Sequence, residues 1–134
     1  PINNTPSYRG GASVIRFNVK TELNKSKIKF KTNRAKEAAQ AQLDQDVLKD
    51  SNYFIPKQDG YLEGSGILHS RIGEGHIEWR TPYARRLYYN PQYNFSKDVN
   101  PNARGLWFEA AKARYKEDWI RRVRREYRKY FDGK

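Results

Sequence analysis

The chain has 134 residues, of which 37% are hydrophobic and 14% aromatic, with no cysteine and a net charge of +12 at pH 7. This length fits one domain, residues 1–134, whose core depends on a few large side chains. The absence of cysteine excludes disulfides and thiolate metal sites. The sequence also has no run of about 18 apolar residues, the length needed to span a membrane. The basic balance predicts attraction to nucleic acid or to acidic protein surfaces.

The first third of the chain predicts an arm, a strand and a helix. Residues 1–12 hold Asn, Pro and Gly clusters typical of an extended, flexible arm. Alternating Ile15, Phe17 and Val19 predict a strand over 13–20 with one buried face. The alternating lysines of 25–31 fit either a lysine-faced edge strand or a short helical or irregular link. Thr32 or Asn33 can then cap a helix over 33–49. Its apolar stripe comprises Ala35, Ala38, Ala39, Leu43 and Val47.

The middle of the chain predicts a β-hairpin. Pro56 and the Asp59-Gly60 pair end the preceding helix and turn the chain. Residues 65–72 and 76–81 then form two strands joined at Gly73-Glu74-Gly75, with Ile77 and Trp79 on the buried face. The opposite face carries His76, Glu78 and Arg80. Beyond Pro82 we expect a helical turn over 84–89 and a long loop over 90–102.

A long amphipathic helix is predicted from residue 102 or 103 to about 130. Tyr115, Trp119, Val123 and Tyr127 recur every fourth residue and define its apolar side. The opposite side is basic, and solvation, DNA and an acidic protein partner are all open explanations of it. The residues concerned are Arg114, Arg121, Arg122, Arg124, Arg125, Arg128 and Lys129.

No assembled catalytic group is recognisable. His69 and His76 face each other across the predicted hairpin beside Glu78, but a third metal ligand is missing, so we interpret them as surface or interface histidines. The glycines lack the pattern of a phosphate-binding loop, and the serines lack a nucleophile elbow. We therefore expect no enzyme activity, no metal and no cofactor.

Several short segments occur in a characteristic order. Tyr53-Phe54-Ile55-Pro56 and Asp59-Gly60-Tyr61-Leu62 precede the stretch from Trp79 to Tyr89, and Asn100-Pro101-Asn102-Ala103, Trp107-Phe108 and Ala110-Ala111-Lys112 follow it. From Val14 to the end, the chain resembles the minor capsid proteins of long-tailed bacteriophages, which are head-tail joining or tail-completion subunits of the neck. The resemblance also favours the short link for residues 25–31.

The resemblance implies a structural virion protein, assembled in the host cytoplasm, that forms a homo-oligomeric ring between head and tail. Its expected partners are a connector or stopper, a tail terminator and the DNA in the channel. The expected fold is α+β, with a small antiparallel sheet packed against the 33–49 helix and the long C-terminal helix. Trp79, Tyr83, Trp107 and Trp119 are expected to be core or interface anchors.

The segment from Arg80 to Phe95, which we call the tyrosine-arginine segment, has two possible interpretations. It could be a stacking platform for single-stranded nucleic acid, or its aromatic side chains could anchor the loop to the core and to neighbouring subunits. The resemblance favours a subunit or partner interface made of Arg80, Tyr83, Arg85, Arg86, Tyr88, Tyr89, Tyr93 and Phe95. The alternative function is a basic nucleic-acid-binding regulator or DNA-processing accessory protein, although the chain has no known DNA-reading motif.

Overall fold

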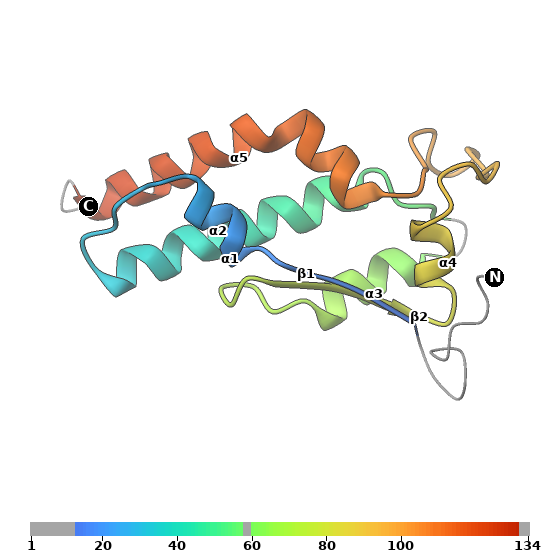
Figure 1. Ribbon diagram of the computed structural model, residues 1–134, viewed down its shortest axis with the longest axis horizontal. Coiled ribbons are helices and arrows are strands. Elements are labelled where there is room, and N and C mark those ends of the chain that lie inside the picture. Colours follow the sequence, from blue (N-terminus) through green and yellow to red (C-terminus); the bar gives the residue numbers. More distant parts are fainter. Residues whose placement is uncertain (1–12, 58–59, 132–134) are drawn as a thin grey trace.

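A computed structural model describes residues 13–57 and 60–131, so the predicted arm over 1–12 lies outside the described residues. The elements, in chain order, are β1 (Ser13–Asn18), α1 (Lys20–Lys25), α2 (Asn33–Asn52), α3 (Tyr61–His69), β2 (His76–Thr81), α4 (Ala84–Tyr88) and α5 (Trp107–Phe131). Figure 1 shows α2 and α5 side by side and antiparallel, with the sheet and α3 on the other side of α2. The fold is α+β, as predicted.

Helix α2 forms where the sequence predicted it and extends to Asn52. The Oγ1 of Thr32 accepts a hydrogen bond from the Ala35 amide at 3.1 Å, which caps the first turn. Ala35, Ala39, Leu43 and Val47 are buried at intervals of four residues, so the predicted small-residue stripe is the face that packs in the core.

Buried polar side chains of α2 connect it to three other parts of the fold. One carboxylate oxygen of Asp44 accepts hydrogen bonds from the amides of Gly73 and Gly75, each at 2.8 Å, and so holds the turn before β2. Asp50 accepts from the indole of Trp119 at 2.7 Å. Asn52 accepts from the indole of Trp79 at 2.9 Å. These bonds fix both the sheet and α5 against α2, because a buried donor left unpaired is costly.

The predicted hairpin is wrong. Residues 61–69 form α3, and β2 pairs instead with the distant β1, in a two-stranded antiparallel sheet that sets Ile15 opposite Trp79 and Phe17 opposite Ile77. His69 and His76 therefore do not face each other across a hairpin. The turn predicted at Gly73-Glu74-Gly75 does form, and a single bridge between Arg71 and His76 closes it. Gly66 brings α3 against Trp79, where a β-carbon would lie 2.7 Å from the indole Cδ1.

Helix α3 covers the edge of β2 at which the partner strand over 65–72 was expected. The amide of Arg80 donates to Ser65 Oγ at 3.0 Å, and the amide of Glu78 donates to Ser70 Oγ at 2.9 Å. Two serine hydroxyls thus take the place of strand carbonyls and satisfy the outward-facing amides of β2.

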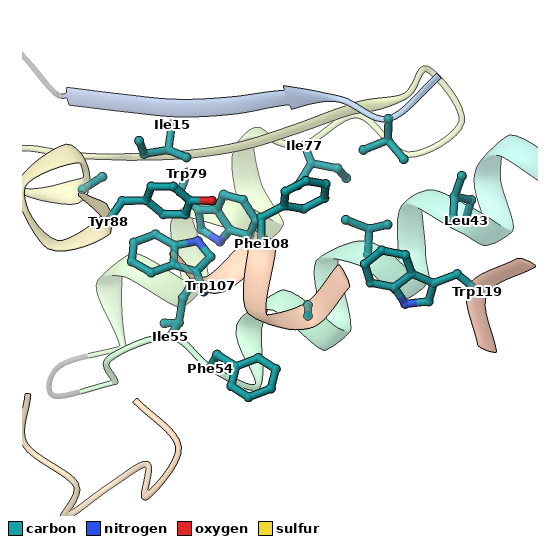
Figure 2. Close-up of a cluster of buried hydrophobic side chains, with 14 of the residues drawn as sticks. Ile15, Leu43, Phe54, Ile55, Ile77, Trp79, Tyr88, Trp107, Phe108 and Trp119 are labelled. Atoms are coloured by element: carbon teal, nitrogen blue, oxygen red, sulfur yellow. The ribbon is translucent and has the colours of Figure 1, made fainter. Parts of the chain in front are cut away.

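Three tryptophans are buried in the core, where Trp79 and Trp107 lie together and Trp119 lies apart from them (Figure 2). Trp79, Trp107 and Trp119 are each at most 1% exposed, and the rings of Trp79 and Trp107 meet edge to face with centroids 5.9 Å apart. Phe17, from β1, stacks on Phe108 of α5 at 4.2 Å. The sheet and α5 therefore share one aromatic cluster.

The C-terminal helix, predicted from residue 102 or 103, begins at Trp107. The side chain of Asn100 donates to the carbonyls of Tyr53 and Ile55 at 2.9 and 2.8 Å, which ties the preceding segment to the end of α2. Leu106 has a φ of 50°, a left-handed conformation that no helix continues through. Residues 89–106 consequently form turns and extended chain before α5 starts at Trp107.

Candidate functional site

The tyrosine-arginine segment is positioned by α4, which is anchored to the start of β1. The amide of Arg85 donates to Ser13 Oγ at 3.1 Å, and the same hydroxyl donates to the carbonyl of Thr81 at 2.9 Å. Ala84 and Tyr88 are buried beneath this short helix. Between these two residues in sequence, Arg85 is half-buried and Arg86 is exposed, so both lie on the side of α4 that faces away from the core.

Tyr88 belongs to the core and not to the surface. Its ring is 1% exposed and meets Trp107 edge to face at 4.6 Å, while its hydroxyl donates to the Glu109 carboxylate. Gly105 packs so tightly against this helix that a β-carbon there would lie 2.7 Å from the Leu87 carbonyl oxygen. The ring of Tyr88 therefore anchors the segment internally and cannot reach a partner.

Four of the eight predicted interface residues line one cleft, which we call the aromatic cleft. Its volume is about 510 Å³, and its walls include Pro56, Lys57, Tyr83, Arg86, Tyr93 and Phe95. The rings of Tyr93 and Phe95 lie 6.1 Å apart, held by a turn in which the Tyr93 amide donates to the Asn90 carbonyl. The cleft combines two cations with three aromatic rings. Two of its residue types, Tyr and Arg, are enriched in protein interfaces.

The other predicted interface residues lie outside that cleft. The Arg85 guanidinium sits 5.1 Å from the centroid of the Tyr89 ring, which is 53% exposed. Arg80 lies on β2, where its guanidinium binds the buried carboxylate of Glu78 through Nε at 2.8 Å and Nη2 at 2.6 Å. Arg80 thus has a structural partner within the chain.

Glu78 is the buried charge on the outer side of the sheet. Its Oε1 lies 2.7 Å from His76 Nε2, and Arg80 binds Oε2. Burial alone would raise the pKa of Glu78, but hydrogen bonds from Arg80 and His76 outweigh burial and hold the pKa below its ordinary value. The histidine that sequence analysis considered as a ligand therefore pairs with a carboxylate. Within residues 13–57 and 60–131, no group of three or more His, Asp or Glu side chains could hold a metal ion.

The predicted basic side of α5 is only partly free. Arg122 is half-buried and pairs with Asp46 of α2 at 3.5 Å, and Arg114 lies 5.8 Å from the ring centroid of Tyr53. Arg121 pairs with Asp118 and Lys129 with Glu126. Arg124, Arg125 and Arg128 are exposed. A shallow hollow of about 450 Å³ between Ile120, Arg121, Arg124 and Arg128 marks this surface.

Sequence reasoning missed an apolar surface on α3. Tyr61, Ile67 and Leu68 are 72%, 66% and 76% exposed. Ile67 and Ile72 line a groove of about 470 Å³ with Leu48 and Tyr53, which we call the α3 groove. Lys57 lines both this groove and the aromatic cleft, so the two hollows adjoin. The wrong hairpin concealed this surface: Leu62, Ser65, Gly66 and His69 have helical spacing, but only Leu62 among them is a large apolar residue, so the spacing was a weak signal.

The described helices include none that is long and apolar enough to cross a bilayer. Comparisons with curated proteins and with solved structures find no match. A family model described as "Minor capsid protein" matches residues 18–127, which is most of the chain. The protein therefore belongs to this minor capsid protein family and is a structural component of the bacteriophage virion.

Proposed function

We propose that this minor capsid protein is a subunit of the phage neck, where a ring of its copies joins the DNA-filled head to the tail. The supporting observation is the adjoining pair of hollows on a chain of this family: the aromatic cleft and the α3 groove together present Tyr and Arg side chains and the exposed Ile67 and Ile72. Exposed apolar side chains gathered on one surface are typical of protein interaction sites.

In a closed ring each subunit offers one surface to a different surface of the next, so the two hollows need not be self-complementary. The other partners in this proposal are a connector or stopper on the head side, a tail terminator on the tail side, and DNA in the channel. The function requires no catalysis, metal or cofactor. Its work is to hold two preassembled structures together.

The test is a joining assay with particles that lack the protein. Purified wild-type chain is added to filled heads and tails, and joined particles are counted by electron microscopy. A Tyr93→Ala, Arg86→Ala variant should bind poorly and leave heads and tails separate, because it removes an aromatic ring and a cation from the aromatic cleft. Arg16→Gln, an exposed position on β1, is the control and should join normally.

The same micrographs locate the protein. Density for the chain between portal and tail would support the neck assignment, whereas density on the capsid shell, with normal joining by the double variant, would refute it.

A further inference from the structure

Almost all of the net charge lies in two short segments of the chain. Residues 25–36 and 121–130 together contain twelve of the 27 basic residues but only one of the fifteen acidic residues, Glu126. The remaining 112 residues hold fifteen basic and fourteen acidic side chains and are close to neutral. We call these two segments the basic end.

The fold brings these segments together although residues 37–120 separate them in the sequence. The Tyr127 hydroxyl of α5 donates to the carbonyl of Lys29 at 3.1 Å, and the rings of Phe30 and Tyr127 meet edge to face at 5.1 Å. Figure 1 shows the α1–α2 link, the start of α2 and the end of α5 at the same end of the molecule. The lysine run and the arginines of α5 therefore form one surface region.

Most of these cations have no carboxylate partner. Eleven of the twelve are exposed, the exception being the half-buried Arg122. Lys25, Arg121, Arg122 and Lys129 pair with nearby carboxylates. Within the described part of the chain, seven others take part in no ion pair: Lys27, Lys29, Arg34, Lys36, Arg124, Arg125 and Arg128. Exposed cations contribute little to folding, so stability does not explain their concentration here.

We propose that the basic end binds the phosphate backbone of double-stranded DNA without reading its sequence. Its chemistry differs from that of a protein interface, where Lys is depleted and the centre is apolar. The large exposed apolar side chains lie mostly on α3 and in residues 89–99, with Tyr130 at this end. A dense set of Lys and Arg with little apolar surface is the pattern of a phosphate-binding surface.

The composition of the basic end also favours duplex over single-stranded nucleic acid as the ligand. Single strands are held by aromatic rings on which successive bases stack. Phe30 and Tyr127 are half-buried and pack against each other, so they are not free platforms. The basic end therefore supplies charge and little stacking surface.

The experiment measures fluorescence anisotropy of a labelled mixed-sequence duplex with the purified full chain over a salt series. Two double variants each remove two cations: Lys27→Gln with Lys29→Gln in the link, and Arg124→Gln with Arg128→Gln in α5. Each should make the log-log salt slope shallower by about 1.8, since each phosphate contact contributes about 0.9. Arg16→Gln with Lys49→Gln removes the same charge from exposed positions elsewhere and should leave the slope unchanged.

Several outcomes would overturn the proposal. They are no duplex binding by wild type at low salt, equal loss in the control variant, or tighter binding to a single strand of the same length. Tighter binding to polyglutamate than to duplex would assign the surface to an acidic protein instead. The proposal does not rest on the neck assignment, and particle joining is a separate readout, so each can fail alone. Circular dichroism verifies that every variant keeps its helices.

Discussion

Gly66 of α3 and Trp79 of β2 are in such close contact that no other residue type fits at position 66 without movement. A β-carbon there would lie 2.7 Å from the indole Cδ1 and 3.1 Å from Leu48 Cδ1. The same Nε1 edge of the indole also donates the hydrogen bond to Asn52, which fixes the ring in place. The site therefore has little room to adjust.

Gly66→Ala should consequently destabilise the protein, by about 1 to 3 kcal/mol, the usual cost of overpacking a core. Gly64→Ala is the matched control, because it lies in the same helix with open space around the added methyl group. Alanine there should be neutral or stabilising by up to about 1 kcal/mol. Urea unfolding of both variants measures the difference, and equal midpoints would show that α3 can shift away from Trp79.

The serine contacts on the edge of β2 make a second prediction. Ser65→Ala removes the acceptor of the Arg80 amide and should cost about 1 to 3 kcal/mol. Ser51→Ala is the comparison, because the Ser51 hydroxyl is buried with no hydrogen-bond partner among the described residues and its removal should be nearly neutral. Thermal unfolding of the two variants gives the answer. Similar melting temperatures would mean that water replaces the lost hydroxyl at β2.

Glu78 predicts a pH dependence of stability. Its pKa in the folded state lies below the ordinary value of 4.5, so its stabilising contribution is present above that value and is lost as pH falls through the folded-state pKa. Glu78→Gln should therefore cost about 1 to 3 kcal/mol near pH 7, and the gap from wild type should close in acid. Urea unfolding over a pH series measures that gap.

A control variant and the behaviour of Asp44 allow the pH dependence to be assigned to Glu78. Glu74→Gln, at an exposed ion pair with Arg71, should show no such closing gap and serves as the control. Asp44 acts in the opposite direction, since burial raises its pKa and its contribution falls as pH rises through the folded-state value. Both Glu variants retain Asp44, so its effect cancels. A gap that stays constant down to low pH would contradict the proposed role of Glu78.

The two faces of α3 should respond differently to substitution. Leu62 is 1% exposed and packs in the core, so Leu62→Ala should cost about 2 to 5 kcal/mol. Leu68→Gln, at an exposed position, should change stability by no more than about 0.5 kcal/mol. In the joining assay, the Leu68 variant should nevertheless yield fewer joined particles. Normal joining by this folded variant would remove the exposed face of α3 from the proposed interface.

Sequence periodicity predicted the elements whose burial follows a regular spacing. The small-residue stripe of α2 and the buried positions Trp119 and Val123 of α5 were predicted correctly for this reason. Helix α3 was not, because two glycines and a serine in nine residues weaken helical propensity, and the contact that justifies Gly66 comes from Trp79, thirteen residues away. Tertiary packing decided the structure of this segment.

The residues of the candidate surfaces could be found from the sequence, but their arrangement in space depends on tertiary packing. The tyrosine-arginine segment was found from composition, but only the fold separates Tyr88, which is buried, from Tyr93, which lines the aromatic cleft. The arginines of α5 were likewise evident. Their union with the lysine run depends on the contact between Phe30 and Tyr127, which no local pattern encodes.

The gathering of charge at one end gives the molecule a large electric dipole along its length. Two copies approaching with these ends together would repel each other, which disfavours head-to-head pairs in solution. A polyanion would turn each approaching copy so that the same end leads. Copies added one after another would then share a common orientation before any specific contact forms, and this sense of direction would come from electrostatics alone.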